Sequence, residues 1–285
     1  MANSASLGSA PAKLPSISGG QPHTVAFGTN KIHYLTLGKG ATTLVFIHGW
    51  ACNLNFWHEQ AAAFADKARL VFIDLPGHGG SDKPNTAYTM DFLARAVVAV
   101  LRDAQVDKAV LVGHSMGASV MCRVYQQAPD RVAALVSVDG LLCRPPGSPE
   151  QAMQFVGMFR VPEYRNHAAR FFSTFFPIPG TEELRDAVIA EMLDTPQYVI
   201  AAEAEGMVGL DQTDWALQNV GVPVLVLNAR NPMWTDRYQY YVQTLSSQVD
   251  YRVYEDVGHF LMLEKPAEFN ANLTEMLQKF GLLPK

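Results

Sequence analysis

One serine in the sequence stands where a catalytic nucleophile is expected. Ser115 lies in the segment Gly113-His114-Ser115-Met116-Gly117, between an apolar run at residues 109–112 and a helical pattern over residues 118–127. A serine at such a strand-to-helix turn is held in a strained conformation that exposes its hydroxyl, and the flanking glycines let strand and helix approach closely. The pattern alone recurs by chance, but its place between a buried strand and a helix predicts a nucleophile for covalent catalysis.

A serine nucleophile needs a general base, and we expect His259 to serve as one. His259 follows the predicted last strand, at residues 250–254, in a loop that would face the strand end carrying Ser115. The order of serine before histidine along the chain is typical of a doubly wound hydrolase. His114 adjoins Ser115 but is expected to pack into the interior. The other candidates lie in an N-terminal hairpin (His23 and His33), on the first helix (His58) and in the central insertion (His167).

A third requirement is a pair of donors for the oxyanion that forms on the substrate. His48-Gly49-Trp50 follows the apolar run at residues 43–47, and Met116 begins the helix after Ser115. We expect the backbone N–H groups of Trp50 and Met116 to converge on one carbonyl oxygen, helped by the positive end of the helix dipole at Met116. His48 is expected to fix the turn.

The elements that must position these residues alternate between strand and helix. A hairpin over residues 24–35 comes first, and then apolar runs of the kind found in strands buried on both faces alternate with amphipathic helices. The predicted strands are 43–47, 70–73, 109–112, 133–138, 222–227 and 250–254, and the predicted helices are 55–67, 90–104, 118–127, 235–245 and 266–280. This order predicts an α/β fold with a mostly parallel, doubly wound sheet.

The alternation is interrupted over residues 142–217, which show helical patterns and no convincing strand. We expect these residues to form a helical cap inserted into a core made of residues 23–141 and 218–285. The cap is rich in large apolar side chains, which suggests an apolar roof over a substrate pocket. They are Met153, Phe155, Met158, Phe159, Phe171, Phe172, Phe175 and Phe176.

Composition excludes several other classes of protein. The 285 residues are 48% hydrophobic and 17% charged, with a formal net charge of −5. This balance excludes a disordered chain and argues against binding to nucleic acid or an anionic membrane surface. The three cysteines, Cys52, Cys122 and Cys143, form no metal-ligand cluster. Nothing in the sequence marks a cofactor or phosphate site, so a cofactor-free reaction is expected.

Residues 1–22 are rich in Ala, Ser, Gly and Pro and lack an apolar run long enough for a signal-peptide core. We expect a flexible tail and no membrane-spanning helix, since no stretch of about 18 apolar residues occurs. The odd number of cysteines favours a reducing compartment. A cytoplasmic protein is therefore expected, although the tail could also be the mature end of an exported protein.

The motifs together resemble the α/β-hydrolase superfamily, in particular its esterase, lactonase and carbon–carbon hydrolase branch. The resemblance rests on His48-Gly49-Trp50, the segment at residues 74–82, the Ser115 motif and Val257-Gly258-His259, and it covers about residues 23–280. It implies a helical cap at residues 142–217. A serine nucleophile implies acyl transfer to water and disfavours dehalogenases and epoxide hydrolases, which use an aspartate.

The resemblance leaves the third member of the triad open. The family usually carries an aspartate after the strand at residues 223–227, where this chain has Asn231. Some branches place the acid at the end of the preceding strand, which here carries Asp139. Asp236 is a third option, but it lies inside the next predicted helix. Asp139 is our assignment, because a carboxylate stabilises the imidazolium that forms during attack.

The expected function is hydrolysis of a small carboxylic ester or lactone with an apolar body, through Ser115, His259 and Asp139. One alternative is a carbon–carbon bond hydrolase of a vinylogous diketone, which would use the same serine and histidine. Another is a non-catalytic ligand receptor that has retained the fold, because fold alone does not fix function.

Overall fold

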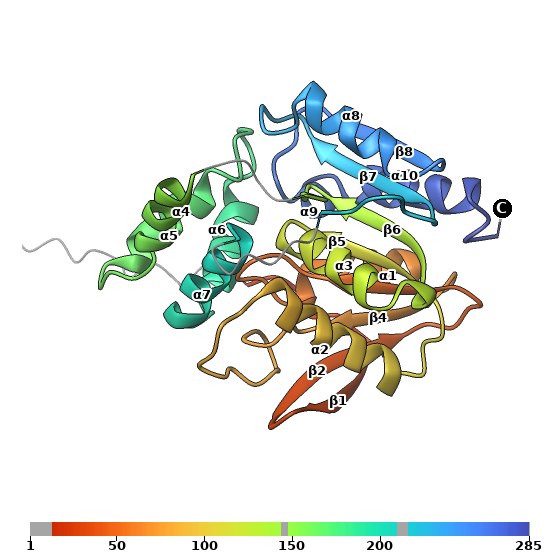
Figure 1. Cartoon of the computed structure of the whole chain (residues 1–285), viewed down its shortest axis with the longest axis horizontal. Helices are drawn as coiled ribbons and strands as arrows, with labels where there is room; N and C mark the ends of the chain where they lie inside the picture. The colour runs from red at the N-terminus through yellow and green to blue at the C-terminus, as the bar shows by residue number, and fades with distance from the viewer. Residues whose placement is uncertain (1–12, 144–147, 210–215, 285) are drawn as a thin grey trace, which may run out of the picture.

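The computed structural model describes residues 13–143, 148–209 and 216–284, and an eight-stranded sheet forms the centre of this part of the chain (Figure 1). The strand order is β1-β2-β4-β3-β5-β6-β7-β8. β1 and β2 form an antiparallel hairpin, β2 runs antiparallel to β4, and all the other neighbours are parallel. The predicted fold class is therefore confirmed. The strands are β1 (Gln21–Phe27), β2 (Asn30–Leu37), β3 (Thr43–Ile47), β4 (Arg69–Ile73), β5 (Ala109–His114), β6 (Val132–Val138), β7 (Val224–Ala229) and β8 (Val249–Tyr254).

The helices of the core flank this sheet. α2 and α3 pack side by side, and α1, α9 and α10 form a second group (Figure 1). The predicted helix at 55–67 is divided into a short 3₁₀ turn, η1, and α1, and α9 precedes the predicted last helix. The bounds are η1 (Leu54–Trp57), α1 (His58–Phe64), α2 (Met90–Asp103), α3 (Met116–Gln127), η2 (Pro129–Arg131), α8 (Asp236–Thr244), α9 (Leu261–Glu264) and α10 (Pro266–Lys279).

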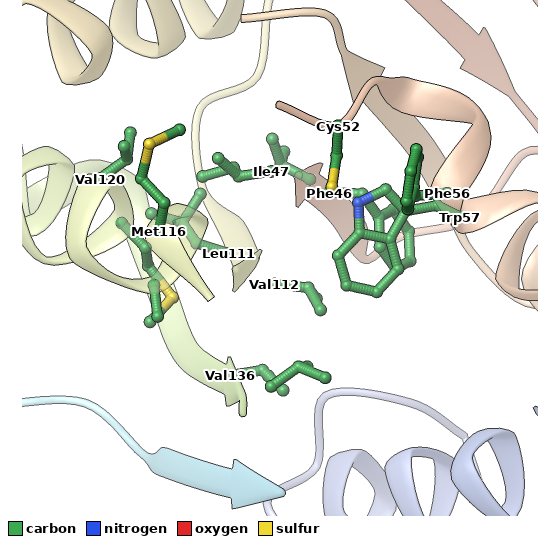
Figure 2. Close-up of a cluster of buried hydrophobic side chains, with 14 of the residues drawn as sticks. Phe46, Ile47, Cys52, Phe56, Trp57, Leu111, Val112, Met116, Val120 and Val136 are labelled. Carbon is green, nitrogen blue, oxygen red and sulfur yellow. The ribbon is translucent and has the colours of Figure 1, made fainter. Parts of the chain in front are cut away.

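The apolar core lies on both faces of the central strands. Every residue of β3, β5 and β7 is buried, as strands covered by helices on both faces require. Figure 2 shows the pattern at the centre of the sheet. Met116 and Val120 of α3 lie on one side of the strand residues, and Phe56 and Trp57 of η1 lie on the other.

The register of the parallel strands brings their carboxyl ends to one edge. Ile47 of β3 pairs with Gly113 of β5, and Val138 of β6 pairs with both His114 of β5 and Leu227 of β7. The residues that follow these ends therefore meet in space, although they are distant in the sequence.

The cap is helical, as predicted, and it lies beyond one end of the sheet (Figure 1). Its described residues form four helices, α4 (Pro149–Gly157), α5 (Tyr164–Ser173), α6 (Glu182–Met192) and α7 (Gln197–Met207). The two ends of the insertion meet, because the N–H of Leu217 donates to the carbonyl of Leu142 at 3.2 Å. Residues 144–147 and 210–215 of the predicted cap lie outside the described residues.

The structure describes residues 13–22 of the predicted N-terminal tail, residues 1–22. Residues 1–12 lie outside the described residues. Leu14 and Ile17 are buried within the apolar core, and β1 begins at Gln21. Across the parts of the chain that are described, no helix combines the length and the apolar character that crossing a membrane requires.

Candidate active site

Ser115 occupies the turn between β5 and α3. Its backbone has φ 51° and ψ −119°, a conformation that side chains other than glycine rarely adopt. Its N–H donates to the carbonyl of Val138 at 3.0 Å, which ties the turn to β6. A Cβ atom on Gly117 would stand 2.3 Å from the carbonyl oxygen of Ile47, so only glycine fits there. The strained turn that the sequence predicts is present.

The structure brings His259 and Asp139 together at the carboxyl edge of the sheet. The Nδ1 atom of His259 donates to Oδ2 of Asp139 at 2.6 Å. Asp139 directly follows β6, is buried, and has a positive φ of 45°. Its Oδ1 atom accepts two further hydrogen bonds, from the N–H of Ala229 at 2.9 Å and from Nε1 of Trp234 at 3.0 Å. The carboxylate is thus satisfied by three donors and oriented towards the imidazole.

The two alternative acids are placed differently. Asn231 is exposed in the loop after β7, and its Oδ1 atom accepts the N–H of Met233 at 2.9 Å. Asp236 is the exposed first residue of α8, where its carboxylate interacts favourably with the positive end of the helix dipole. Of the three carboxylate or amide candidates, Asp139 is the one that is hydrogen-bonded to His259.

Glu264 of α9 holds the loop that carries His259. Its two carboxylate oxygens accept the N–H groups of Gly258 at 2.8 Å and Phe260 at 3.1 Å, on either side of the histidine. Burial raises the pKa of Glu264, and these hydrogen bonds oppose the rise. The N–H of His259 itself donates to the carbonyl of Phe175 in the cap at 2.9 Å. The backbone of the histidine is therefore fixed by both the core and the cap.

His114 is buried, as predicted, and it packs beside His259. Its Nε2–H donates to the carbonyl of His259 at 2.9 Å, and the two rings are 4.7 Å apart. Burial holds the pKa of His114 well below its usual range, and the neighbouring His259 lowers it further. A neutral His114 can donate through Nε2 without placing a second positive charge next to His259.

The expected oxyanion donors lie next to Ser115. Trp50 and Met116 both line the cavity that contains Ser115, and Met116 is the first residue of α3. A Cβ atom on Gly49 would stand 3.2 Å from Cβ of Ser115, so the loop of Trp50 packs directly against the serine turn.

His48 fixes this loop. Its Nδ1–H donates to the carbonyl of Gly49 at 2.8 Å, and its Nε2 accepts the N–H of Leu75 at 3.0 Å. Burial lowers the pKa of His48 to about 3, and the nearby His78 adds to this effect. His48 therefore remains neutral and joins the loop after β3 to the loop after β4.

A cavity of about 300 Å³ contains Ser115, His259 and Asp139. Three of the aromatic cap residues singled out in the sequence, Phe155, Phe171 and Phe175, line it, so the cap covers the carboxyl edge of the sheet as expected. Others have different roles: Phe159 and Phe172 are buried against the ring of Trp50. The further lining residues include Ser119, Leu141, Thr174, Met207, Val208, Met233, Trp234 and Val257.

Sequence reasoning missed two residues that hold the site. Glu264 lies four residues after the turn at Phe260, where a carboxylate is typical of a helix, and Trp234 lies two residues after Asn231-Pro232, where the sequence indicates only a turn. The hydrogen bond of Trp234 could not be found from spacing, because it depends on how the loops after β6 and β7 meet, and those of Glu264 depend on how α9 folds back on the loop before it. Within the described ranges, no group of three or more His, Cys, Asp or Glu residues is arranged to hold a metal ion.

Comparisons with known proteins agree with this architecture. Two curated relatives are dihydrolipoyllysine-residue acetyltransferase components of acetoin cleaving systems, from Pseudomonas putida (39% identical over 118 residues, 41% of this chain) and Cupriavidus necator (28% over 260 residues, 87% of this chain). The present chain spans 32% and 66% of the lengths of these relatives. Another relative, 3-oxoadipate enol-lactonase 2 of Acinetobacter baylyi, is 26% identical over 258 residues, which cover 88% of this chain and 94% of the relative.

The solved structures include Est816, described as an N-acyl homoserine lactone degrading enzyme. It is 27% identical, with a TM-score of 0.76 over 89% of this chain and 99% of its own. The sequence model of the alpha/beta hydrolase fold family matches residues 42–266, which is most of the chain. The chain therefore belongs to the alpha/beta hydrolase fold family.

Proposed function

We propose that this hydrolase cleaves a carboxylic ester or lactone with an apolar body, using Ser115, His259 and Asp139 as a catalytic triad. The observation that carries the proposal is the 2.6 Å hydrogen bond from His259 to the buried Asp139, in the same cavity as the strained Ser115. A histidine that is oriented by a carboxylate and shares a cavity with a serine hydroxyl can activate that serine for acyl transfer.

In this mechanism, Oγ of Ser115 attacks the substrate carbonyl while His259 accepts its proton. The N–H groups of Trp50 and Met116 stabilise the negative oxygen, and Asp139 stabilises the imidazolium. His259 then protonates the leaving oxygen as the carbon–oxygen bond breaks, which leaves an acyl-enzyme. A water molecule, deprotonated by His259, attacks the acyl carbonyl and regenerates the serine. In a lactone the leaving alcohol is part of the acyl chain, so it stays attached through both steps and the product is a single hydroxy acid.

The cavity supports an apolar substrate of modest size. Its walls are mainly aromatic and aliphatic, and residues 142–217, which we propose as the cap over a core of residues 23–141 and 218–285, supply Phe155, Phe171 and Phe175. Apolar walls favour acyl or alkyl groups longer than acetyl, because each buried methylene contributes about 0.8 kcal/mol. The similarity to a lactone-degrading enzyme and to an enol-lactonase supports testing lactones alongside simple esters.

A substrate panel with an active-site probe tests the proposal. The panel contains p-nitrophenyl esters from acetate to decanoate, several lactones and one vinylogous diketone, and a fluorophosphonate probe reports a reactive serine. We expect ester or lactone turnover, with kcat/KM rising from acetate to medium-length acyl groups. Turnover of the diketone alone would instead assign carbon–carbon hydrolysis, and neither turnover nor labelling would indicate a receptor.

Ser115→Ala should abolish both turnover and labelling, because it removes the attacking oxygen. The loss of kcat expected for a triad nucleophile is on the order of 10⁴-fold or more. Ser246→Ala is a matched control, since Ser246 lies in the loop between α8 and β8, and its hydroxyl donates to the carbonyl of Val222 away from the cavity. If Ser115→Ala kept a tenth of the wild-type rate with its fold intact, the assignment of the nucleophile would be wrong.

A further inference from the structure

Trp234 links the wall of the cavity to the acid of the proposed triad. It lies in the loop between β7 and α8, and its side chain lines the cavity. Its Nε1–H donates to Oδ1 of Asp139 at 3.0 Å. This oxygen is opposite the one that accepts the hydrogen bond from His259.

The loop after β7 is built to present this indole. Oδ1 of Asn231 accepts the N–H of Met233 at 2.9 Å, and the carbonyl of Asn231 accepts the N–H of Trp234 at 3.0 Å, which closes a tight turn. The next residue, Thr235, caps α8 by accepting the N–H of Tyr238 at 3.2 Å. Asn231 thus shapes a turn at the position where the family resemblance predicts an acid.

The ring of Trp234 is also supported from the side. It packs on Tyr238 with ring centroids 5.2 Å apart. The hydroxyl of Tyr238 donates to the carbonyl of Gly140 at 3.1 Å, directly after Asp139. The indole and the residue that follows the acid are therefore fixed by the same tyrosine.

We propose that Trp234 is a positioning residue for the triad, whose indole N–H sets the plane and the charge of the Asp139 carboxylate. The proposal rests on the function proposed above, since it assigns Trp234 a role only through Asp139 and His259. A carboxylate can rotate about its last bond. Two donors on Oδ1, from Ala229 and Trp234, hold it so that Oδ2 faces His259. Hydrogen bonds to a buried carboxylate are stronger than those between neutral groups.

Removing the N–H while keeping an aromatic ring isolates this role. Trp234→Phe should lower kcat about tenfold, the scale expected for one hydrogen bond to a charged group, and leave KM within about twofold. Trp57→Phe is the matched control. Trp57 is buried away from the cavity, and its Nε1 has no hydrogen-bond partner among the described residues, so its replacement should leave kcat unchanged. A Trp234→Phe variant that changes KM and chain-length preference but not kcat would make the ring a cavity wall only and overturn the proposal.

Coupling to Asp139 provides the second readout. In an Asp139→Ala background, Trp234→Phe should cause no further loss of kcat, because the group on which it acts is absent. A second tenfold loss in that background would show that Trp234 acts independently of the acid and would overturn the proposal.

The pH profile supplies a third readout that a purely structural role would not move. The titratable groups packed around the imidazole of His259 are Asp139, His114 and Glu264, and Tyr251 interacts electrostatically with Asp139. Without the indole N–H, more of the carboxylate's charge is available to the imidazolium. The acid limb of kcat/KM should therefore move to higher pH in Trp234→Phe and stay in place in Trp57→Phe. An unmoved limb would overturn the proposal.

The failure of this proposal can be distinguished from failure of the proposed function. If Ser115→Ala remains active, the triad itself is wrong. If Ser115→Ala is inactive while Trp234→Phe matches Trp57→Phe in kcat and pH profile, the triad stands and only the role of Trp234 falls.

Discussion

At the scale of single residues, the position of the acid determines how the site works. Asp139 follows β6, and its carboxylate accepts three hydrogen bonds from groups on three different segments. Asn231 stands in the loop after β7, where its amide oxygen accepts a backbone N–H of the same loop. The carboxylate thus directly follows β6, and the end of β7 and the loop after it supply two of the donors that hold it.

Substitution at the candidate acids tests this arrangement. Asp139→Asn should lower kcat on the order of 10⁴-fold, the effect of the equivalent change in serine proteases, because an amide cannot stabilise the imidazolium. Asn231→Ala removes one turn hydrogen bond and should lower kcat by no more than about fivefold. Asp236→Asn at the exposed start of α8 serves as the control. Steady-state kinetics on the best substrate of the panel measures all three, and a severe Asp236→Asn with a mild Asp139→Asn would reverse the assignment.

At the scale of elements, α7 attaches the cap to the core. Trp50 donates its Nε1–H to the carbonyl of Ile200 on α7 at 3.0 Å. Glu203, also on α7, places Oε2 3.2 Å from Nε2 of His78 in the loop after β4, and both side chains are fully buried. The attraction between the Glu203 carboxylate and the imidazole of His78 is chiefly electrostatic. Burial opposes the charge of His78, but Glu203 outweighs it and raises the pKa of His78.

Glu203→Ala should therefore destabilise the protein strongly. Removing one partner of a buried ion pair leaves the other charge unpaired and costs about 3–5 kcal/mol. Glu205→Ala on the same helix is the matched control, since Glu205 pairs with Arg160 near the surface and such pairs contribute about 0–1 kcal/mol. Urea unfolding at pH 7 measures the free energies. Equal losses in the two variants would mean that the buried pair does not stabilise the cap on the core.

The elements were predictable from sequence to the extent that local pattern determines them. The buried strands, the hairpin, the serine turn and the helical cap follow from apolar runs, glycine placement and helical spacing. The division of residues 54–64 into η1 and α1 was not predictable, because the side chain of Asn53 caps the turn by accepting the N–H of Asn55. Trp234 supports the site through a contact between two loops, and Glu264 does so where α9 folds back on the loop before it; a sequence carries no periodic signal for either contact.

At the scale of the whole molecule, buried histidines make stability depend on pH. His48 and His114 are fully enclosed and neutral, with burial as the main cause of their lowered pKa values. In the unfolded chain both would titrate near pH 6.5. Below that pH the unfolded state binds protons that the folded state does not, so the folded state loses stability as the pH falls.

The window for this loss is bounded for His48, whose pKa is lowered to about 3. Between about pH 6.5 and 3, it should remove about 1.4 kcal/mol of unfolding free energy for each unit of acidification. Asp74, whose pKa is lowered from 3.8 by hydrogen bonds from His33 and two backbone N–H groups that outweigh its burial, adds to the loss only at the acid end of this window. His78, with a raised pKa, has the opposite sign and loses stability as the pH rises.

Replacing His48 separates its share from the others. His48→Gln removes the titrating group. The slope of unfolding free energy against pH between 6 and 4.5 should therefore fall by the contribution of one proton, about 1.4 kcal/mol per pH unit, although the variant is less stable at every pH. His167→Gln on the exposed face of α5 should leave the slope unchanged, because that imidazole is solvated in both states. Urea titrations at pH 7.5, 6.0, 5.25 and 4.5 give the slopes. A His48→Gln slope equal to that of the wild type would mean that the buried imidazole is protonated in the folded state. His48 would then not form a neutral hydrogen-bonded link between the loops after β3 and β4.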